Sequence, residues 1–211
     1  MFKKVFTCIT MIFLCLPVSL RADDIFGLGI HLGAQHNVGY VGDQDSSMLT
    51  DPQNSMLLGL AVKVNASFFF IRTGFDTTFL LNQGKVVENS SQIEKYKINY
   101  VAVPFFLGLR FPIRDRGEFY MGGGMAYFLG SGEVTLTTGA TEDISSVNYG
   151  YGFITGIQFS VLPDVRFYME WEYFDARSGA VLKTQSAYAW DNFYIDYTGH
   201  RILLGVMYYL L

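Results

Sequence analysis

The sequence predicts an all-β protein in which eight strands form one closed, antiparallel, up-and-down barrel that crosses a membrane. Three observations predict this fold. Apolar and polar residues alternate with period two in eight segments. No segment combines a helical apolar repeat with capping residues. Long and short connections alternate along the chain. The composition is 50% hydrophobic and only 16% charged, whereas globular chains average about 25% charged residues.

Residues 1–22 are predicted to be a secretory signal peptide and are set apart from the fold. Two lysines precede an apolar run over residues 5–20, and Ala22 supplies the small residue expected before a cleavage site. A retained anchor helix is the alternative, although the run is short for a membrane span. A lipid-anchored Cys15 is a second alternative, which lacks the small residue such a site normally needs. Residues 23–211 therefore form one domain, the barrel.

Eight segments carry the period-two alternation, and each has one face of large apolar residues. They are Phe26–Ala34, Met56–Val64, Phe69–Phe79, Tyr96–Phe111, Glu118–Leu129, Tyr149–Val161, Val165–Phe174 and Tyr194–Leu210.

The opposite face of the first four segments is small, polar or charged. It is mostly glycine in the first segment and includes Lys63 in the second. Arg72 and Asp76 share this face in the third segment, and Arg110 lies on it in the fourth. The fourth segment also contains Pro104, which cannot donate to a ladder and predicts a bulge or an edge-like position.

The same opposite face continues through the last four segments. In the fifth, a run of three glycines at 122–124 lies within the strand, so it predicts close packing rather than a phosphate-binding loop. Glycine and Gln158 make up this face in the sixth segment. Arg166, Glu170 and Glu172 lie on it in the seventh, and Arg201 in the eighth.

The connections divide into two classes that alternate without exception. The long ones are 36–55, 81–95, 130–148 and 175–193, and the short ones are 65–67, 112–117 and 162–164. An up-and-down meander places every long loop at one end of the barrel and every short turn at the other. This asymmetry is typical of outer-membrane barrels, which have long extracellular loops and short periplasmic turns.

The two faces decide between a membrane barrel and a soluble one. In a soluble barrel the apolar face fills the interior, whereas in a bilayer the apolar face points outward and the polar face encloses the lumen. The polar face here consists largely of glycines, with a few polar side chains and charges of both signs. Such a face is too small to cover the surface of a soluble barrel. The sequence therefore predicts that Phe75, Trp171 and Leu204 point outward and that Arg72 and Glu170 point inward.

Three blocks resemble small eight-stranded outer-membrane β-barrel proteins of the OmpA, OmpX and OmpW type, namely 100–111, 119–124 and 204–210. The resemblance implies a location in the bacterial cell outer membrane, with outer-membrane lipid around the barrel. It also implies assembly by the barrel-insertion machinery, which reads a carboxy-terminal aromatic residue. This chain departs from that pattern, because Leu210 and Leu211 stand at its end.

A network of charged side chains is predicted inside the lumen, because an eight-stranded barrel is only just wide enough to be filled by side chains. Buried charges are tolerated when they are paired and hydrogen-bonded. A path for water or solute lined by the same charges is the alternative. The predicted members are Lys63, Arg72, Asp76, Arg110, Arg166, Glu170, Glu172 and Arg201, with His31 nearby.

The predicted function is a structural or surface-interaction role exerted through four long extracellular loops, with no cofactor. One alternative is a narrow channel for small or hydrophobic solutes, as the OmpW-type resemblance implies. The other is a lipid-modifying enzyme that uses His31, His36 or His200 with a nearby acid such as Asp43, Asp45 or Asp196.

We expect no enzyme, no metal site and no nucleic-acid partner. Asp196 and His200 are four residues apart on one predicted strand, and hence about 13 Å apart. No pair of histidines or cysteines has the spacing of metal ligands, and the chain has no cluster of basic residues. Loop segments such as 42–54 and 175–192 are predicted to contact a surface ligand or to serve as solvated connectors.

Overall fold

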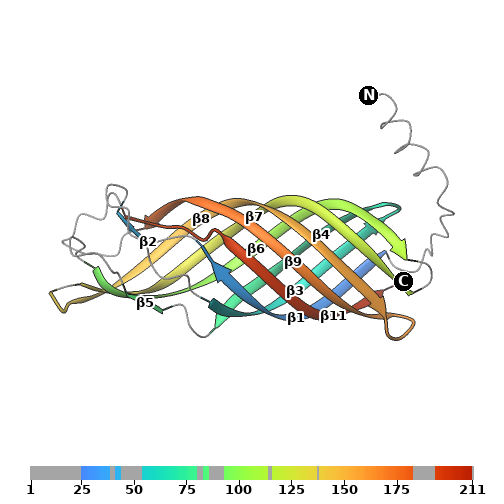
Figure 1. Cartoon of the computed structure of the whole chain (residues 1–211), viewed down its shortest axis with the longest axis horizontal. Helices are drawn as coiled ribbons and strands as arrows, with labels where there is room; N and C mark the ends of the chain where they lie inside the picture. The colour runs from blue at the N-terminus through green and yellow to red at the C-terminus, as the bar shows by residue number, and fades with distance from the viewer. Residues whose placement is uncertain are drawn as a thin grey trace, which may run out of the picture.

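The computed structural model describes residues 25–38, 41–43, 54–79, 83–85, 93–113, 116–136, 138–182 and 193–210. Figure 1 shows an elongated cylinder of tilted strands. The strands that form its wall are β1 (Phe26–Asn37), β3 (Asn54–Ala66), β4 (Phe69–Phe79), β6 (Ile93–Ile113), β7 (Gly117–Leu136), β8 (Thr141–Ser160), β9 (Val165–Leu182) and β11 (Gly199–Leu210). Three short strands, β2 (Val41–Asp43), β5 (Gln83–Lys85) and β10 (Phe193–Ile195), lie at the end opposite the short turns.

The eight wall strands form a closed ring in the order β4, β3, β1, β11, β9, β8, β7, β6. A further pairing between β4 and β6 closes the ring, and every pairing is antiparallel. Chain neighbours are ring neighbours throughout, apart from the short strands, and β1 meets β11 at the seam between the chain ends. The predicted eight-stranded up-and-down barrel is confirmed. Closure leaves no unpaired strand edge around the wall, as hydrocarbon surroundings require.

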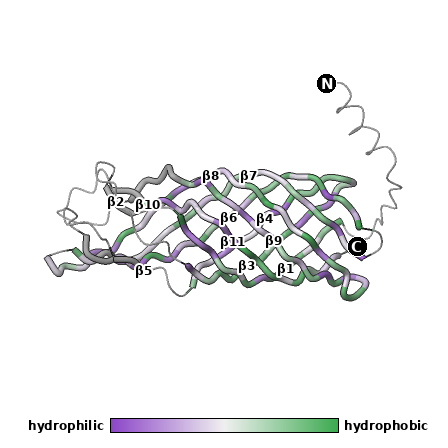
Figure 2. The backbone as a smooth tube through the Cα atoms, viewed as in Figure 1, coloured by the Kyte–Doolittle hydropathy of each residue, from purple (hydrophilic) through white to green (hydrophobic). Residues whose placement is uncertain are grey.

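The prediction of one long loop is wrong, and a second long loop is shorter than predicted. The segment 130–148 is mostly strand, because β7 runs to Leu136 and β8 begins at Thr141 with Gly130 opposite Ser146. Strand β9 likewise continues to Leu182. The barrel therefore has three long connections and one tight hairpin at this end. These strand ends lie beyond the large apolar residues that the sequence pattern depended on, and Figure 2 shows hydrophobic positions concentrated toward the short-turn end.

The last predicted strand also begins too early. Strand β11 starts at Gly199, whereas Phe193–Ile195 forms β10 and pairs with β2. The residues between β10 and β11, from Asp196 to Thr198, are buried. This segment therefore turns into the barrel instead of continuing its wall.

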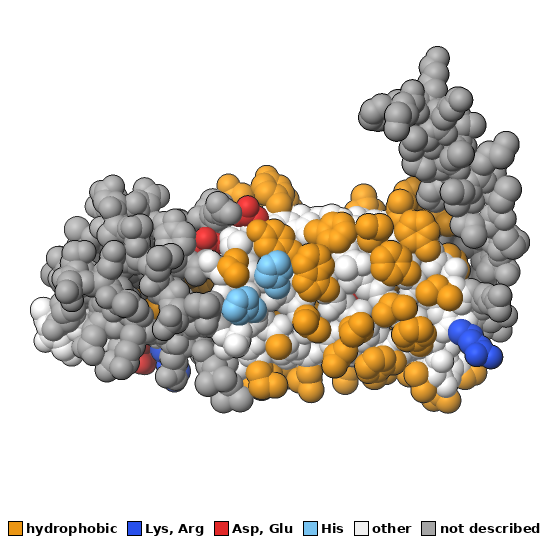
Figure 3. Space-filling model, viewed as in Figure 1, with side chains coloured by type: hydrophobic (Ala, Val, Ile, Leu, Met, Phe, Trp, Pro, Cys, Tyr) orange, Lys and Arg blue, Asp and Glu red, His pale blue; other side chains and the backbone are white. Residues whose placement is uncertain are grey.

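The apolar face points outward, as predicted. Phe75 and Leu204 are each 48% exposed and Trp171 is 37% exposed, whereas Arg72 and Glu170 are at most 1% exposed. Figure 3 shows hydrophobic side chains over the visible wall of the barrel. Among the described residues, no helix is long and apolar enough to cross a membrane.

Pro104 interrupts one of its two ladders. Against β7 the register continues through Pro104 opposite Ala126 without a shift. Against β4 the paired positions skip Val103 and Pro104, and the Thr73 hydroxyl donates to the Pro104 carbonyl at 2.8 Å. The register to β4 is the same on both sides of this gap, so neither a bulge nor a strand edge is found at Pro104, which lies in a strand with a neighbour on each side.

Candidate functional site

The middle of the lumen holds a cluster of buried charges contributed by β4, β9 and β11. The Arg72 guanidinium donates to Glu170 through Nε at 3.0 Å and through Nη2 at 2.7 Å. Glu172 lies between Arg72 and a second arginine, Arg201. Its carboxylate is 3.8 Å from Arg72 Nη1 and 3.6 Å from Arg201 Nη1. Arg201 Nη1 also reaches Asp76 Oδ2 at 3.1 Å. Because each ion has an opposite partner, the cost of burying it is offset.

Glycines in the lumen wall allow polar side chains two strands apart to meet. Tyr168 of β9, Gly205 of β11, His31 of β1, Gly59 of β3 and Asp76 of β4 follow one another across the sheet in register. The Tyr168 hydroxyl lies 2.8 Å from His31 Nδ1, and His31 Nε2 lies 2.8 Å from Asp76 Oδ1. Each contact passes over a glycine, where a side chain would block it.

Adding a methyl group at Gly59 is expected to lower the free energy of unfolding by about 1–3 kcal/mol, the usual range for overpacking a filled interior. A Cβ atom at this position would overlap both the His31 ring and the Asp76 carboxylate. Denaturant unfolding of refolded Gly59→Ala protein measures the effect. Gly123→Ala is the matched control, because a Cβ there meets only the Gly152 carbonyl at 3.8 Å. Equal stability of the two variants would contradict the close packing of His31 and Asp76 over Gly59.

A second cluster lies nearer the short turns and centres on Glu118. Its carboxylate accepts a hydrogen bond from the buried Lys63 and lies 2.6 Å from Arg110 Nη2. The Lys63 ammonium is also 3.5 Å from the centre of the Tyr120 ring, a favourable cation–π distance. The prediction of the network did not include Glu118. Its position on the face opposite Phe119 was the signal that would have placed it in the lumen.

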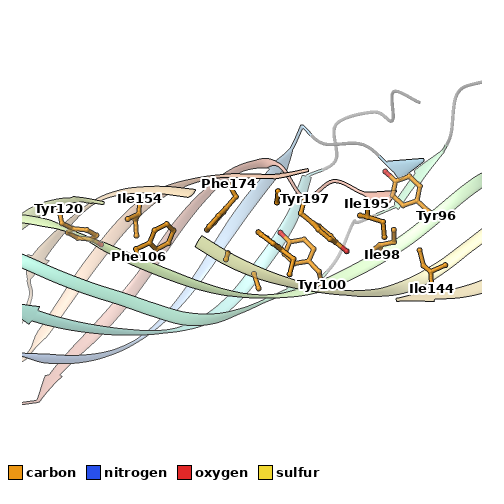
Figure 4. Close-up of a cluster of buried hydrophobic side chains, with 14 of the residues drawn as sticks. Tyr96, Ile98, Tyr100, Phe106, Tyr120, Ile144, Ile154, Phe174, Ile195 and Tyr197 are labelled. Carbon is orange, nitrogen blue, oxygen red and sulfur yellow. The ribbon is translucent and has the colours of Figure 1, made fainter. Parts of the chain in front are cut away.

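An aromatic layer lies above the charges, toward the long connections. The Phe128 and Tyr197 rings stack with centroids 5.3 Å apart, and Tyr100 packs edge-on to Tyr197 at 4.9 Å. The Arg201 guanidinium lies 4.8 Å from the Phe174 ring. Arg201 therefore joins the ionic and aromatic layers. Figure 4 shows the buried apolar side chains lined up along the barrel axis.

The segment that turns inward before β11 completes this layer. Asn148 donates to the Ala176 carbonyl at 2.6 Å and to the Ile195 carbonyl at 3.0 Å. The Thr198 amide donates to the Asp196 carboxylate at 2.8 Å. These bonds satisfy backbone groups that would otherwise be buried without partners. The chain thereby places buried residues 195–198 inside the outer part of the barrel.

The structure places all eight predicted lumen residues inside the barrel. Seven are buried, and Arg110 is the least enclosed, with 11% of its side chain exposed. It brings seven of them into ion pairs, together with Glu118 and His31. The Arg166 guanidinium lies 5.2 Å from the centre of the Tyr209 ring.

The described residues that were considered for catalysis are divided between the lumen and the outer face of the barrel. Asp45 lies outside the described residues, and Asp43 lies in β2. Asp196 caps the Thr198 amide, while His36 is exposed and the opposed His200 is half-buried on the outer face. His31 pairs with Asp76, a partner from another strand that sequence spacing does not reveal. Among the described residues, no group of three or more histidines, cysteines or acids is arranged to hold a metal ion.

Comparison with known proteins agrees with this architecture. A family model described as an outer membrane protein beta-barrel domain matches residues 6–209. OprG from Pseudomonas aeruginosa has a TM-score of 0.66 at 14% identity, over 88% of this chain and 95% of that chain. Neisserial surface protein A has a TM-score of 0.54 at 11% identity, over 88% and 97%. A search of curated protein sequences finds no match. At these identities the structural likeness shows a shared fold.

Proposed function

Because this chain belongs to the outer membrane protein β-barrel family and its place is the bacterial outer membrane, we propose that it is a closed barrel that presents its extracellular connections to surface partners and conducts no ions. Outer-membrane lipid surrounds the barrel, and the barrel-insertion machinery assembles it. The loop ligand is a surface molecule of the cell or its surroundings. The filled lumen is the feature that favours this role over transport.

The ion pair between Arg72 and Glu170 carries the proposal. Strands β4 and β9 stand opposite one another in the ring of eight. A bidentate pair between them therefore spans the full width of the lumen and occupies its centre. The aromatic layer around Phe128 and Tyr197 forms a second barrier above it. Two filled layers in series oppose the passage of water and ions.

The test is the conductance of purified protein in planar bilayers. The unmodified barrel is expected to give no discrete current steps, because the ion pair and the aromatic layer both block the lumen. A variant that lacks both barriers, with Arg72, Glu170 and Phe128 each replaced by alanine, is expected to conduct. The matched control is Leu60→Ala on the outer wall, which is expected to stay closed. Reproducible single-channel steps from the unmodified protein would overturn the closed barrel and favour the narrow channel.

Passage of hydrophobic solutes is a second candidate, favoured by the lining of the outer lumen. Tyr96, Ile98, Ile144 and Ile195 are all buried there, and such a lining suits apolar molecules better than ions. The charged middle layer opposes complete passage. Liposomes that contain the protein and an entrapped reporter of hydrophobic solutes distinguish the two functions: accelerated entry supports transport, and an unchanged rate supports the closed barrel.

An enzymatic role is not part of the proposal. His31 and Asp76 resemble half of a catalytic relay, but His31 is 2% exposed and Asp76 is fully buried. The other ring nitrogen of His31 contacts the Tyr168 hydroxyl, which is also buried. A lipid or soluble substrate therefore has no access to this pair. Its geometry suits a role in packing the lumen.

A further inference from the structure

Two histidines from opposite ends of the chain lie next to one another on the outer face of the barrel. His36 belongs to β1 and His200 to β11, and the register places them directly opposite. Directly opposed residues of an antiparallel pair point to the same face, with Cβ atoms about 4.5–5.5 Å apart. Figure 3 shows histidine side chains side by side on the wall, at the end of the apolar band nearest the long connections.

The His36 ring is held in the form that a metal ligand requires. Its Nδ1 atom lies 2.9 Å from Asn54 Oδ1. An amide oxygen only accepts, so Nδ1 carries the proton and the lone pair remains on Nε2. Metal-binding histidines almost always donate their second ring nitrogen to an oxygen in this way, which fixes the tautomer and orients the ring.

The His200 ring is positioned by aromatic neighbours on β9. Its centroid lies 4.9 Å from that of Tyr173 and 5.7 Å from that of Trp171, with the Trp171 ring inclined by 24°. These contacts use the faces of the imidazole, and within the described part of the chain no hydrogen bond engages its nitrogens. The ring leans toward β9, so side-chain rotation toward β1 is required before both histidines reach one ion.

We propose that His36 and His200 form a two-histidine site for a divalent transition-metal ion, with Cu²⁺ or Zn²⁺ as the ligand class. Neutral imidazole suits both ions, and a metal–nitrogen distance of about 2.0–2.1 Å is within reach of side chains that start on opposed positions. Water completes the coordination, because the site lies at the rim of the apolar band. An ion bound here joins the first and last wall strands across the seam that closes the barrel.

Trp171 supplies a reporter for the experiment. The chain has two tryptophans, so Trp190→Phe leaves Trp171 as the only tryptophan, and its emission is excited selectively over that of the tyrosines. Titration of this refolded protein with Cu²⁺ is expected to quench its fluorescence to saturation at one ion per barrel. His36→Gln and His200→Gln are each expected to abolish saturable quenching. Asn54→Ala removes the orienting acceptor and is expected to weaken binding about tenfold.

A control and a second measurement keep the result interpretable. Tyr151→Ala, an exposed residue elsewhere on the wall, is expected to bind like the parent. Electron paramagnetic resonance of the Cu²⁺ complex is expected to show two nitrogen ligands in the parent and fewer in each histidine variant. Heat-modifiable migration on gels verifies that every variant is folded. Quenching that persists unchanged in either histidine variant, or a single nitrogen ligand in the parent, would overturn the site.

Discussion

Replacing Asp76 by alanine is expected to lower the free energy of unfolding by about 3–5 kcal/mol, the usual cost of leaving a buried charge without its partner. Asp76 is fully buried and contacts both His31, at 2.8 Å, and Arg201, at 3.1 Å. Without it, Arg201 retains only the longer contact to Glu172 at 3.6 Å among its ion pairs. Urea unfolding of the refolded protein measures the loss.

Removal of an exposed carboxylate from the same barrel is the matched control. Glu133 lies exposed on β7, and Glu133→Ala is expected to change stability by no more than about 0.5 kcal/mol. Asp76→Asn keeps a hydrogen-bond acceptor and is expected to fall between the two. If Asp76→Ala were as mild as Glu133→Ala, the lumen charges would not form a tightly packed, water-excluded cluster.

A charge placed on the outer wall is expected to have a comparable effect in lipid. Leu204 lies near the middle of β11 and is 48% exposed. In a bilayer this position faces hydrocarbon, so Leu204→Arg is expected to destabilise the barrel by about 2–4 kcal/mol. Reversible unfolding from phospholipid vesicles measures the change.

An arginine introduced in a short turn is the matched control. It separates the effect of membrane depth from the effect of losing an apolar side chain. Val161 lies in the turn between β8 and β9 and is 65% exposed. Val161→Arg is expected to cost about 0–1 kcal/mol, because the penalty falls toward the membrane interface. Equal effects at positions 161 and 204 would argue against a lipid-facing wall.

The ends of the strands mark where sequence prediction stopped. Within the apolar band, the polarity of each side chain in a segment such as 165–174 indicates whether it points to lipid or to the lumen. The predicted faces are confirmed there. Beyond the band the outer face carries polar residues such as Glu133, whereas the inner face carries buried apolar residues such as Leu136 and Ile144. The alternation therefore no longer has its apolar side outward. For this reason the continuation of β7 to Leu136 and the start of β8 at Thr141 read as loop.

The pairing of charged side chains within the lumen was the second feature that the sequence could not predict. The charges were assigned to the lumen from their face alone, but Glu118 was omitted and no pairing could be derived. Arg72 meets Glu170 because β4 and β9 stand opposite one another in the closed ring. His31 reaches Asp76 because a glycine on β3 lies between them. Both contacts depend on ring order and strand register.

The amino-acid sequence by itself determined the eight wall strands, their outward and inward faces and the charged lumen, because period-two alternation is a local property that every strand displays alone. Only the tertiary structure decided which charges pair, where the chain folds back into the lumen before β11, and that His36 and His200 become neighbours. The physical reason is that these contacts join strands far apart in the chain, and the closure and register of the ring bring them together.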